Sequence, residues 1–337
     1  MKSVVIQEPE KLVIEERPIP QPLPGEVRLR VESAGICGSD VHIYRGHNPF
    51  AKYPRVIGHE FFGRIDAVGE GVESSRIGER VVGDPVVSCG HCYPCSVGKP
   101  NVCTSLQVIG VHRDGGFSEY ITLPARNAHV VPDSIADREA TMIEPFTIAA
   151  NICSQMNPGP LDVALVYGAG PMGLTTIQAL RGVYGVKEII VADRLDERLT
   201  MAKESGADRI INNTDIDLAS ELSKLGIRPT LIVDAACHVS ILPEAIGLAS
   251  PAARIGIMGF SSEPCMISQQ GITSKELTIY SSRLNSNRFP MVIDWMVKGK
   301  IAPEKLITHQ FDYTHVINAM EIFEKDPKTC CKVLLKF

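Results

Sequence analysis

The strongest constraint on the fold of this 337-residue chain is an apolar run that ends in a glycine-rich turn. Residues 162–167 (DVALVY) form the run, as expected of a parallel strand covered on both faces. Residues 168–173 (GAGPMG) follow directly, and a stretch with helical character comes after them. This order of strand, tight turn and helix is typical of the first unit of a dinucleotide-binding sheet.

Each residue type in the turn suits a nucleotide. Gly168 permits the tight turn, Gly170 lets the backbone approach a pyrophosphate, and Gly173 allows close packing of helix on strand. Pro171 fits the first helical turn, where its missing N–H costs nothing. The free N–H groups at the start of the helix attract phosphate groups.

The second predicted strand, 188–192, leads into an acidic residue, Asp193. It lies at about the 20-residue distance expected for the carboxylate that holds the ribose hydroxyls. A carboxylate accepts hydrogen bonds from both hydroxyls and repels a 2′-phosphate, so the sequence favours NAD over NADP. Arg194 leaves NADP open as the alternative, because a guanidinium beside the carboxylate tolerates a phosphate.

The elements along the chain indicate two domains of different class. Short strands at 27–31, 64–68 and 80–82, divided by Pro and Gly turns, predict a mostly-β domain, barrel-like or sandwich-like. From 162 onward, strands alternate with helices, and further strands are expected at 209–212, 231–234 and 253–258; this pattern predicts a doubly wound parallel sheet. Helices at 289–298 and 314–325 and a strand at 331–337 form the tail, which we expect to return to the first domain. The predicted fold is thus α/β, with a nucleotide-binding domain at 151–286 and a mostly-β domain at 1–150 and 287–337.

Four of the ten cysteines are clustered, at Cys89, Cys92, Cys95 and Cys103. Four thiolates bind Zn²⁺ tetrahedrally and leave no open position, so this set predicts a structural zinc site. An iron–sulfur cluster is the chemical alternative, although nothing else in the sequence indicates electron transfer.

A second candidate metal set is spread over three segments: Cys37 in AGICGSDVH, His59 and Glu60 in VIGHEFFG, and Glu144 in MIEPF. One thiolate, one imidazole and one carboxylate leave a position for water or substrate, which is typical of a catalytic zinc. A single cysteine, histidine or glutamate more often has a structural role than binds a metal. The assignment of these residues to one metal ion therefore depends on a resemblance to a known family.

The chain resembles the zinc-containing medium-chain dehydrogenases nearly from end to end. The matching segments are GEVRLRVESAGICGSDVHIYRG, GHEFFGRIDAVGEGV, GERV, CGHCYPCSVGKPNVC, GGFSEY, the glycine loop and a late MGF. The pattern is similar to the sorbitol and threonine dehydrogenase branch. The resemblance implies a GroES-like catalytic domain that carries two zinc ions, a Rossmann domain that binds NAD, and a homodimer or homotetramer.

The resemblance also implies roles for particular residues. Cys37, His59 and Glu144 would bind the catalytic zinc, and Glu60 would be a fourth or alternating ligand. Ser39 would touch the substrate hydroxyl, and His42 would pass its proton towards solvent. The candidate cofactor-binding residues are Gly168, Gly170, Pro171, Met172, Gly173, Asp193, Arg194, Arg198, Gly259 and Arg283.

The function expected from these residues is hydride transfer between NAD and a secondary alcohol of a small polar substrate, a sugar acid or a polyol. Arg45, Asn48 and Arg113 would suit a carboxylate, which favours a hexonate. Two alternatives remain. A zinc-free quinone or enone reductase would lack both metal sets, and a non-catalytic metabolite-sensing or regulatory protein would not need an open zinc position.

The charge and the apolar content of the chain limit which partners it can bind and where in the cell we expect it. The formal net charge is −5, which does not indicate a binder of nucleic acid or of an anionic membrane. No apolar stretch reaches the roughly 18 residues of a membrane span, and the first residues lack the apolar core of a signal peptide. We therefore expect a cytoplasmic protein, in which clustered cysteines are metal ligands more often than disulfides.

Overall fold

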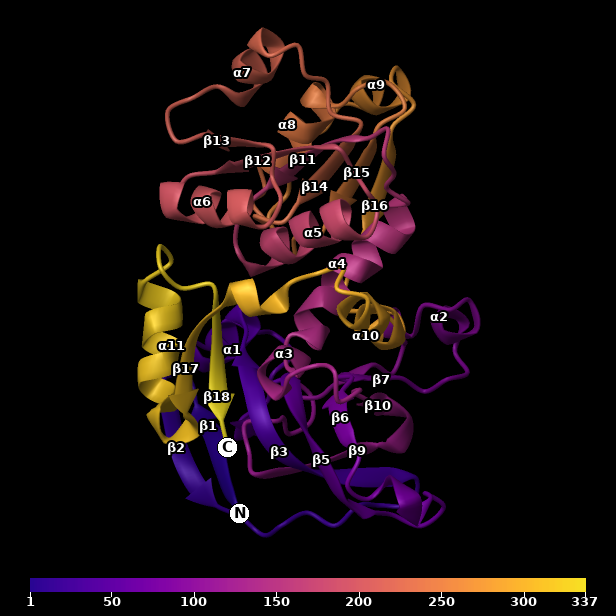
Figure 1. Cartoon of the computed structure of the whole chain (residues 1–337), viewed down its shortest axis with the longest axis vertical. Coiled ribbons are helices and arrows are strands. Elements are labelled where there is room, and N and C mark those ends of the chain that lie inside the picture. The colour runs from indigo at the N-terminus through magenta and orange to yellow at the C-terminus, as the bar shows by residue number, and fades with distance from the viewer. The chain divides into compact units, whose positions relative to one another are not determined.

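The computed structural model describes residues 1–337, which form two compact units (Figure 1). The first unit contains residues 1–144, 289–297 and 303–337, and the second contains residues 145–288 and 298–302. Residues 298–302 join the second unit because Gln178 exchanges two hydrogen bonds with the backbone of Ala302, at 3.1 and 2.8 Å. None of the helices combines the length and the apolar composition needed to cross a membrane.

The first unit is built on a seven-stranded sheet in the order β10-β6-β5-β3-β18-β17, with β9 also paired to β3. Its strands are β3 (Glu26–Ile36), β5 (Glu60–Val68), β6 (Arg80–Gly83), β9 (Tyr120–Pro124), β10 (Ala128–Val130), β17 (Ile307–Asp312) and β18 (Lys332–Lys336). The long strand β3 has three antiparallel partners, β5, β9 and β18. The predicted strands at 27–31, 64–68 and 80–82 lie within β3, β5 and β6.

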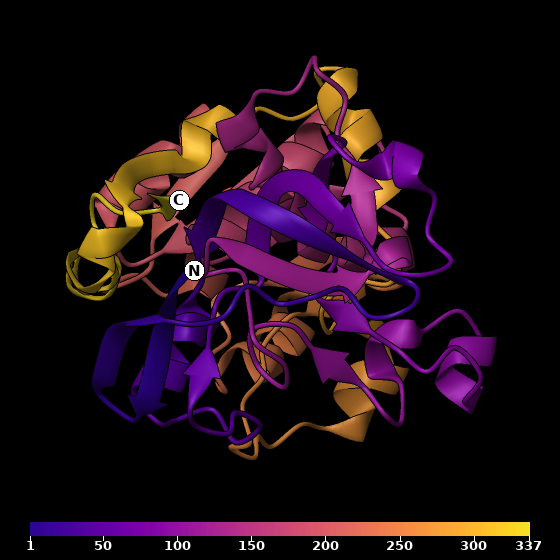
Figure 2. The ribbon, with the colours of Figure 1, turned by 90° about the horizontal axis from the view of Figure 1, so that it is seen from below.

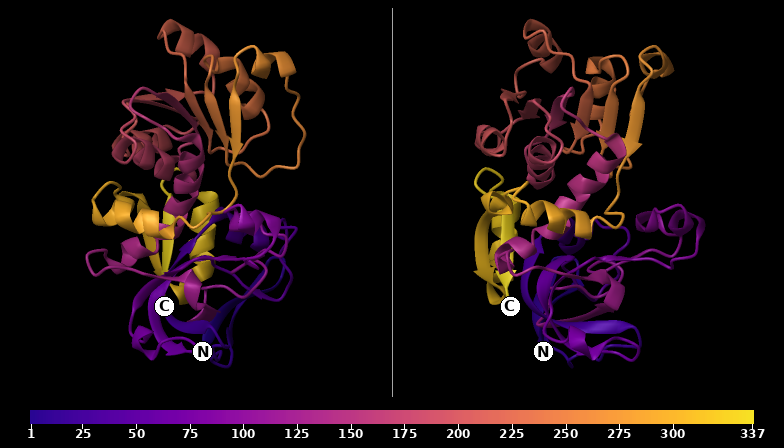
Figure 3. Two further views of the ribbon diagram at one scale, coloured as in Figure 1. Left: turned by 90° about the vertical axis from the view of Figure 1, so that its right-hand side faces the viewer. Right: turned by 45° about the vertical axis from the view of Figure 1, so that its right-hand side comes forward.

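Two smaller sheets and several short helices complete this unit. The strands are β1 (Lys2–Glu8), β2 (Lys11–Glu16), β4 (Arg55–Val56), β7 (Val86–Val87) and β8 (Gln107–Val108). The helices are α1 (Gly38–Tyr44), α2 (Tyr93–Ser96), α3 (Asp137–Ala140), α10 (Phe289–Val297) and α11 (Val316–Lys325), with 3-10 turns at Ser74–Arg76, Pro100–Val102, Ala125–Asn127, Pro303–Leu306 and Tyr313–His315. The segment that carries α2 projects from the rest of the unit (Figures 1 and 3).

The tail of the chain returns to the first unit, as predicted. Strand β18 is antiparallel to β3, with Val333 opposite Ile36 and Leu335 opposite Ala34, and β17 runs parallel to β18. Both termini therefore lie in this unit and are close together in each view (Figures 1 and 2). The last residues of the chain thus form an interior strand of the sheet and not its edge.

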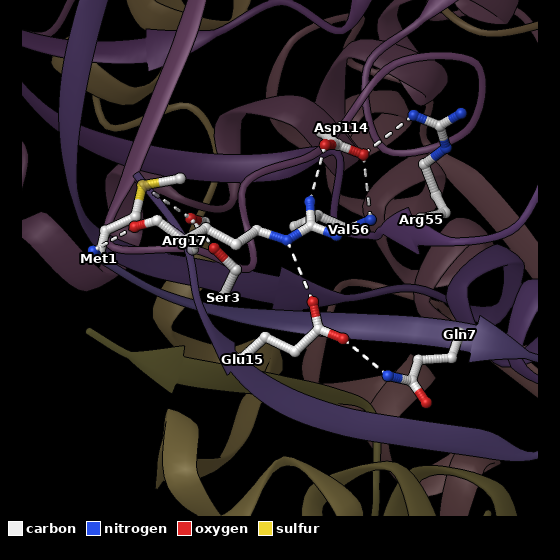
Figure 4. A network of polar contacts seen from close by, with 9 residues as sticks. Met1, Ser3, Gln7, Glu15, Arg17, Arg55, Val56 and Asp114 are labelled. Atoms are coloured by element: carbon white, nitrogen blue, oxygen red, sulfur yellow. Dashed lines mark hydrogen bonds and ion pairs between the residues drawn. The ribbon is translucent and has the colours of Figure 1, made fainter. Parts of the chain in front are cut away.

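A polar network around Asp114 fastens the N-terminal hairpin to this unit (Figure 4). The Asp114 carboxylate accepts hydrogen bonds from Arg17 at 3.1 Å, from Arg55 at 2.9 Å and from the Val56 N–H at 3.2 Å. Arg17 also donates to Glu15 at 3.3 Å, and its carbonyl accepts from the N-terminal ammonium at 2.7 Å. The network therefore joins strand β2, strand β4 and the loop at 114.

The loop after Asp114 consists of two glycines, Gly115 and Gly116, whose backbone packs closely against the residues around His59. A Cβ on Gly115 would lie 2.3 Å from the Gly58 carbonyl oxygen, and one on Gly116 would lie 2.6 Å from the Phe61 side chain. Gly58 itself has φ +94°, a conformation that favours glycine. The Asp114 network thus helps to fix the backbone that enters β5.

The second unit is a six-stranded parallel sheet in the order β13-β12-β11-β14-β15-β16. Its strands are β11 (Val163–Tyr167), β12 (Glu188–Asp193), β13 (Arg209–Asn212), β14 (Leu231–Asp234), β15 (Arg254–Ile257) and β16 (Thr278–Ser281). Its helices are α5 (Pro171–Gly182), α6 (Asp196–Glu204), α7 (Leu218–Lys224), α8 (Ile241–Leu248) and α9 (Gln269–Thr273), and α4 (Ile143–Met156) runs across the boundary between the units.

Helices cover both faces of this sheet (Figure 3). Leu165 and Tyr167 of β11 pack into a buried apolar cluster with residues of α7 and α8, among them Leu218 and Ile241. The alternate residues Ala164 and Val166 are also fully buried, which explains why the strand reads as a continuous apolar run. The strand order reverses direction beside β11, and ligands bind parallel sheets of this kind at that point.

We predict that Asp114→Ala lowers the free energy of unfolding by about 1–2 kcal/mol, because two guanidinium groups and one backbone N–H lose a charged acceptor. The loss stays modest because the Asp114 side chain is 51% exposed. Urea unfolding would measure it. Asp133→Ala is the control, since that side chain is 96% exposed and its removal should cost less than about 0.5 kcal/mol. Equal losses in the two variants would contradict the role assigned to the network.

Candidate metal and cofactor sites

Strand β3 delivers Cys37 to the start of helix α1, where a buried aspartate organises the backbone. Cys37 is the residue before the first turn of α1, and its N–H donates to Asp40 at 2.9 Å. The second carboxylate oxygen of Asp40 accepts the Gly58 N–H at 3.2 Å. Because Asp40 is fully buried, one carboxylate ties the residue that carries the thiol to the residue that precedes His59.

Cys37, His59 and Glu60 come together, as predicted. Their ligand atoms all lie within 4.8 Å of one another, and both His59 and Glu60 are buried. The Nδ1 atom of His59 lies 3.6 Å from Asp40, which is longer than a hydrogen bond, and Nε2 lies 3.4 Å from the Ser39 hydroxyl. A carboxylate behind an imidazole is the usual support of a histidine that binds metal.

The protonation of His59 reflects the same neighbours. Burial alone lowers the pKa of His59, but the negative charge of Asp40 raises it, and the pKa ends well above its ordinary value. A metal ion binds the neutral imidazole, so metal binding at His59 competes with protonation of the ring.

Glu144 lies near Cys37, His59 and Glu60 but is not among the residues whose ligand atoms all lie within 4.8 Å of one another. It is in the first turn of α4 and is 3% exposed. Burial raises the pKa of Glu144 to about 8, while His59 lowers it and Glu60 raises it by smaller amounts. A carboxylate so buried needs a cation to hold its charge at neutral pH, and a bound metal ion would supply one. The three-residue group and this second carboxylate are a donor set that suits zinc.

Lys332 is a member of this site that the sequence analysis missed. Its ammonium lies 2.7 Å from each carboxylate oxygen of Glu60 and 3.2 Å from the Ile36 carbonyl oxygen. Burial alone lowers the pKa of Lys332, but Glu60 raises it above its ordinary value. The available signal was a lysine inside the apolar segment CKVLLKF, since lysine is almost never fully buried without a partner.

Ser39 and His42 lie three positions apart on α1, so they share one face of that helix. Ser39 is half-buried beside His59, whereas His42 is exposed and its ring centre is 6.3 Å from that of His47. The arrangement leads from the buried ligand group to the surface within one turn of helix.

The four clustered cysteines meet around a single point. The Sγ atom of Cys92 lies 3.4 Å from that of Cys95 and 3.7 Å from that of Cys103. The Sγ atoms of Cys103 and Cys89 are 3.5 Å apart. A disulfide needs about 2.05 Å, so these atoms are too far apart for one. Four sulfurs at about 2.3 Å from a zinc ion are separated by about 3.8 Å, which is close to the spacing found here.

The backbone of the cysteine lobe favours thiolates at two of these positions. N–H groups of Thr104 and Cys95 lower the pKa of Cys92 to about 5, and those of His91 and Cys92 lower the pKa of Cys89. His91 is exposed, and its ring nitrogen Nδ1 lies 3.0 Å from the Cys89 carbonyl oxygen. The lobe therefore fits a structural zinc site.

The glycine turn has the geometry expected of a phosphate-binding loop. Gly168 has φ +87°, and a Cβ on Gly173 would lie 1.8 Å from the Gly168 carbonyl oxygen. Pro171 and Met172 are the first residues of α5, and Gly170 precedes them. The nearest side-chain atom to a Cβ on Gly170 would be a guanidinium nitrogen of Arg198, at 3.8 Å. The loop thus offers backbone N–H groups with a cation beside them.

A pocket of about 760 Å³ adjoins this loop in the second unit. Four predicted residues line it: Gly168, Asp193, Arg194 and Arg198. The Asp193 carboxylate accepts the Ala169 N–H at 2.7 Å and the Leu195 N–H at 2.9 Å, which fixes it at the end of β12. Other polar residues of the lining were not predicted from the sequence, namely Asn213, Asp217, His238, Ser240 and Glu244.

The remaining predicted cofactor residues lie outside this lining. Gly259 follows β15, and a Cβ there would lie 3.1 Å from the Cα atom of Cys237, which follows β14. Arg283 follows β16, and its guanidinium lies 5.4 Å from the ring centre of Phe260. Both residues come after strands of the parallel sheet, at the edge where the glycine loop also lies.

The three residues predicted to receive a substrate carboxylate have partners within the protein. Arg45 donates to Glu324 at 2.5 Å and to Glu10 at 3.0 Å, and Arg113 donates to Glu26 at 3.0 Å. The Asn48 side chain accepts the N–H groups of Phe50 and Ala51. These side chains therefore do not support the hexonate hypothesis.

Comparison with known proteins shows the family to which the chain is similar. Residues 23–133 match the family described as "Alcohol dehydrogenase GroES-like domain", and residues 171–298 match "Zinc-binding dehydrogenase". The chain is 68% identical over 337 residues to the starvation-sensing protein RspB of Escherichia coli (strain K12), with 100% of this chain and 99% of that protein covered. It is 32% identical over 332 residues to L-galactonate-5-dehydrogenase of the same strain, with 97% and 95% covered.

A solved structure is similar over its whole length. The crystal structure of the rspB alcohol dehydrogenase from E. coli CFT073, complexed with NADH, has a TM-score of 0.99 with this chain. The two share 67% sequence identity, and the match covers 100% of this chain and 99% of the other.

We predict that Cys103→Ser lowers the zinc content by one ion per chain and the free energy of unfolding by about 3 kcal/mol or more, because the lobe loses one of four thiolates. Metal analysis by atomic emission and thermal unfolding would measure both effects. Cys265→Ser is the matched control, since Cys265 is exposed and outside the quartet. An unchanged zinc content in Cys103→Ser would contradict the structural site.

Proposed function

The chain belongs to the zinc-type medium-chain alcohol dehydrogenase family, as its motifs predicted, and on that premise we propose that it oxidises a secondary alcohol of a small polar substrate. The proposed substrate is a sugar acid or a polyol, the hydride acceptor is NAD, and each chain holds two zinc ions. The observation that carries the proposal is the group of Cys37, His59 and Glu60, whose ligand atoms lie within 4.8 Å of one another beside Ser39.

Zinc held by this group would act as a Lewis acid that lowers the pKa of the substrate hydroxyl. The chain's own residues do the rest. Asp40 orients the His59 ring and the backbone at Cys37. The Ser39 hydroxyl accepts the proton that the substrate loses and gives up its own proton towards His42. His42, on the same face of α1 and exposed, takes up that proton and releases it to solvent, because an imidazole both accepts and donates protons.

The second unit would bind the cofactor through the glycine loop and Asp193. The loop's N–H groups and Arg198 would hold the pyrophosphate, and the Asp193 carboxylate would accept hydrogen bonds from the ribose hydroxyls. Arg194 lines the same pocket, so the preference for NAD over NADP rests on Asp193.

The sugar acid is supported by the similarity to L-galactonate-5-dehydrogenase, although Arg45, Asn48 and Arg113 do not contribute to it. Other cations are available in the first unit, where Lys52 and Arg55 line a hollow of about 360 Å³ together with Phe50 and His112. Arg55 donates to Asp114 through one nitrogen, whereas its Nε has no hydrogen-bond partner in the protein.

A non-catalytic, metabolite-sensing role is the second candidate, and the printed name of RspB, a starvation-sensing protein, favours it. A sensor needs neither an open metal position nor a path for a proton. The Ser39 hydroxyl beside the ligand group and the exposed His42 support the enzyme.

We predict that the purified protein reduces NAD⁺ with one class in a panel of aldonates, polyols and hydroxy amino acids. Ser39→Ala should lower kcat by about 10²-fold or more, because the substrate loses its proton acceptor. Initial rates followed at the NADH absorbance would measure this. Ser223→Ala is the control, because this exposed hydroxyl on α7 lies outside the ligand group and both pockets. Two bound zinc ions with no turnover of any substrate would favour the sensor.

We also predict that Asp193→Ser shifts the cofactor preference towards NADP. The ratio of kcat/KM for NAD⁺ to that for NADP⁺ should fall at least about tenfold, because the ribose hydroxyls lose a charged acceptor and a 2′-phosphate loses a repelling charge. The ratio is informative even if the variant is less stable, since one preparation serves both cofactors. An unchanged ratio would show that Asp193 does not face the ribose.

A further inference from the structure

The cofactor contacts proposed so far use one side of the pocket in the second unit. The glycine loop comes directly after β11, and Asp193 ends β12. The lining continues to residues of α8, which follows β14 in the chain, and β14 pairs with β11 on the side opposite β12. At about 760 Å³ the pocket has room for a whole small ligand. The part beside α8 is therefore available to the base that the ribose carries.

The lining of this pocket suits a flat base with polar atoms along its edge. Its larger aliphatic side chains are those of Leu195, Ile216, Leu218 and Ile241. Aliphatic surface covers the faces of a planar ring, whereas the hydrogen-bonding atoms at the edge of the ring need polar partners. The polar groups of the lining therefore decide which base fits.

Glu244 is the acidic residue of the lining that is left for a ligand. Asp193 already accepts two backbone N–H groups, and Asp217 accepts the Ser220 N–H at 2.9 Å and so caps α7. Glu244, in the first turn of α8, is half-buried and accepts no backbone N–H. A carboxylate can only accept hydrogen bonds, so a ligand group that faces Glu244 must be a donor.

Tyr167, the last residue of β11, adds a buried hydroxyl beside this carboxylate. Tyr167 is 2% exposed, and its hydroxyl has no hydrogen-bond partner in the protein. A buried hydroxyl without a partner destabilises the fold, and a phenylalanine would avoid that loss. Burial raises the pKa of Tyr167 and the negative charge of Glu244 raises it further, so the phenol keeps its proton. It can donate that proton to one oxygen of Glu244 when the glutamate turns inwards, which leaves the other oxygen for the pocket.

We propose that Glu244, positioned by the Tyr167 hydroxyl, accepts a hydrogen bond from the exocyclic amino group of adenine and so selects the base of the cofactor. Hypoxanthine has a carbonyl oxygen where adenine has this amino group. A carboxylate and a carbonyl oxygen are both acceptors, so they repel each other when no proton lies between them. The inference rests on the proposed function, because it assumes that a nicotinamide dinucleotide occupies this pocket.

Binding of reduced cofactors tests the inference without an alcohol substrate. The two probes are NADH and reduced nicotinamide hypoxanthine dinucleotide, which differ only in the base. The fluorescence of the dihydronicotinamide gives the Kd of each probe with the zinc-loaded full chain. We expect wild type to bind NADH at least about tenfold more tightly, because the other base leaves the Glu244 carboxylate facing an acceptor.

Glu244→Gln keeps the shape of the side chain and changes its hydrogen bonding. An amide can accept from the amino group of adenine or donate to the oxygen of hypoxanthine, so the ratio of the two Kd values should fall to near one. Glu204→Leu is the control, because Glu204 is exposed on α6 and outside the lining. This variant should keep the wild-type ratio.

Tyr167→Phe tests the positioning role. Loss of the hydroxyl should lower the Kd ratio by about threefold, because the Glu244 carboxylate is no longer held towards the base. Tyr167→Phe/Glu244→Gln should show the same ratio as Glu244→Gln alone, since the hydroxyl acts only through Glu244. A purely structural role for Tyr167 would change stability and leave the Kd ratio as in wild type, which would overturn the positioning role.

The wild-type protein alone is a sufficient test if the variants fail to fold. Equal Kd values for the two probes in wild type would overturn the inference, and so would a wild-type ratio retained in Glu244→Gln. Failure of wild type to bind either probe would instead overturn the proposed function, and the inference with it.

Discussion

The pairing of β3 with two antiparallel neighbours is the constraint on which the candidate metal site depends. Cys37 follows the last residue of β3, His59 and Glu60 stand where β5 begins, and Lys332 begins β18. Because β5 and β18 both run opposite to β3, their first residues lie beside its last ones. Four functional side chains from three distant segments are thus brought together by backbone hydrogen bonds alone.

Asp40 refines what the sheet provides. Its carboxylate accepts N–H groups on both sides of the site and faces the His59 ring. A buried carboxylate with these partners holds two ligands at a fixed separation before any metal arrives, which lowers the cost of ordering them on binding. Three glycines pack the backbone near the site, because a side chain at Gly58 or Gly116 would collide with an aromatic ring and one at Gly115 with a carbonyl group.

The sequence predicted those parts of the molecule whose chemistry is local. The glycine turn, the cysteine quartet and the β-strands of both units follow from spacing over a few residues. The tail reaches the first unit through the pairing of β18 with β3. Lys332 escaped prediction because its partner is 272 residues away, and only the strand register places it on the same face as Glu60. Distance along the chain also explains why Arg45 and Arg113 were predicted to receive a substrate carboxylate. Each already has a carboxylate partner within the protein, but that partner comes from a distant segment and cannot be found from local spacing; the partners are Glu324, Glu10 and Glu26.

The position of β18 inside the sheet has a consequence for the folding of the protein during translation. The second unit is almost one continuous stretch of chain, so its parallel sheet can close while synthesis continues. The first unit cannot, because an interior strand of its sheet, β18, is translated after the whole of the second unit. Until those residues emerge, β3 has an unpaired edge beside the thiol of Cys37, and the carboxylate of Glu60 has no counter-ion. The order of synthesis thus makes the unit that holds the candidate metal site mature after the second unit, although most of its residues precede that unit in the chain.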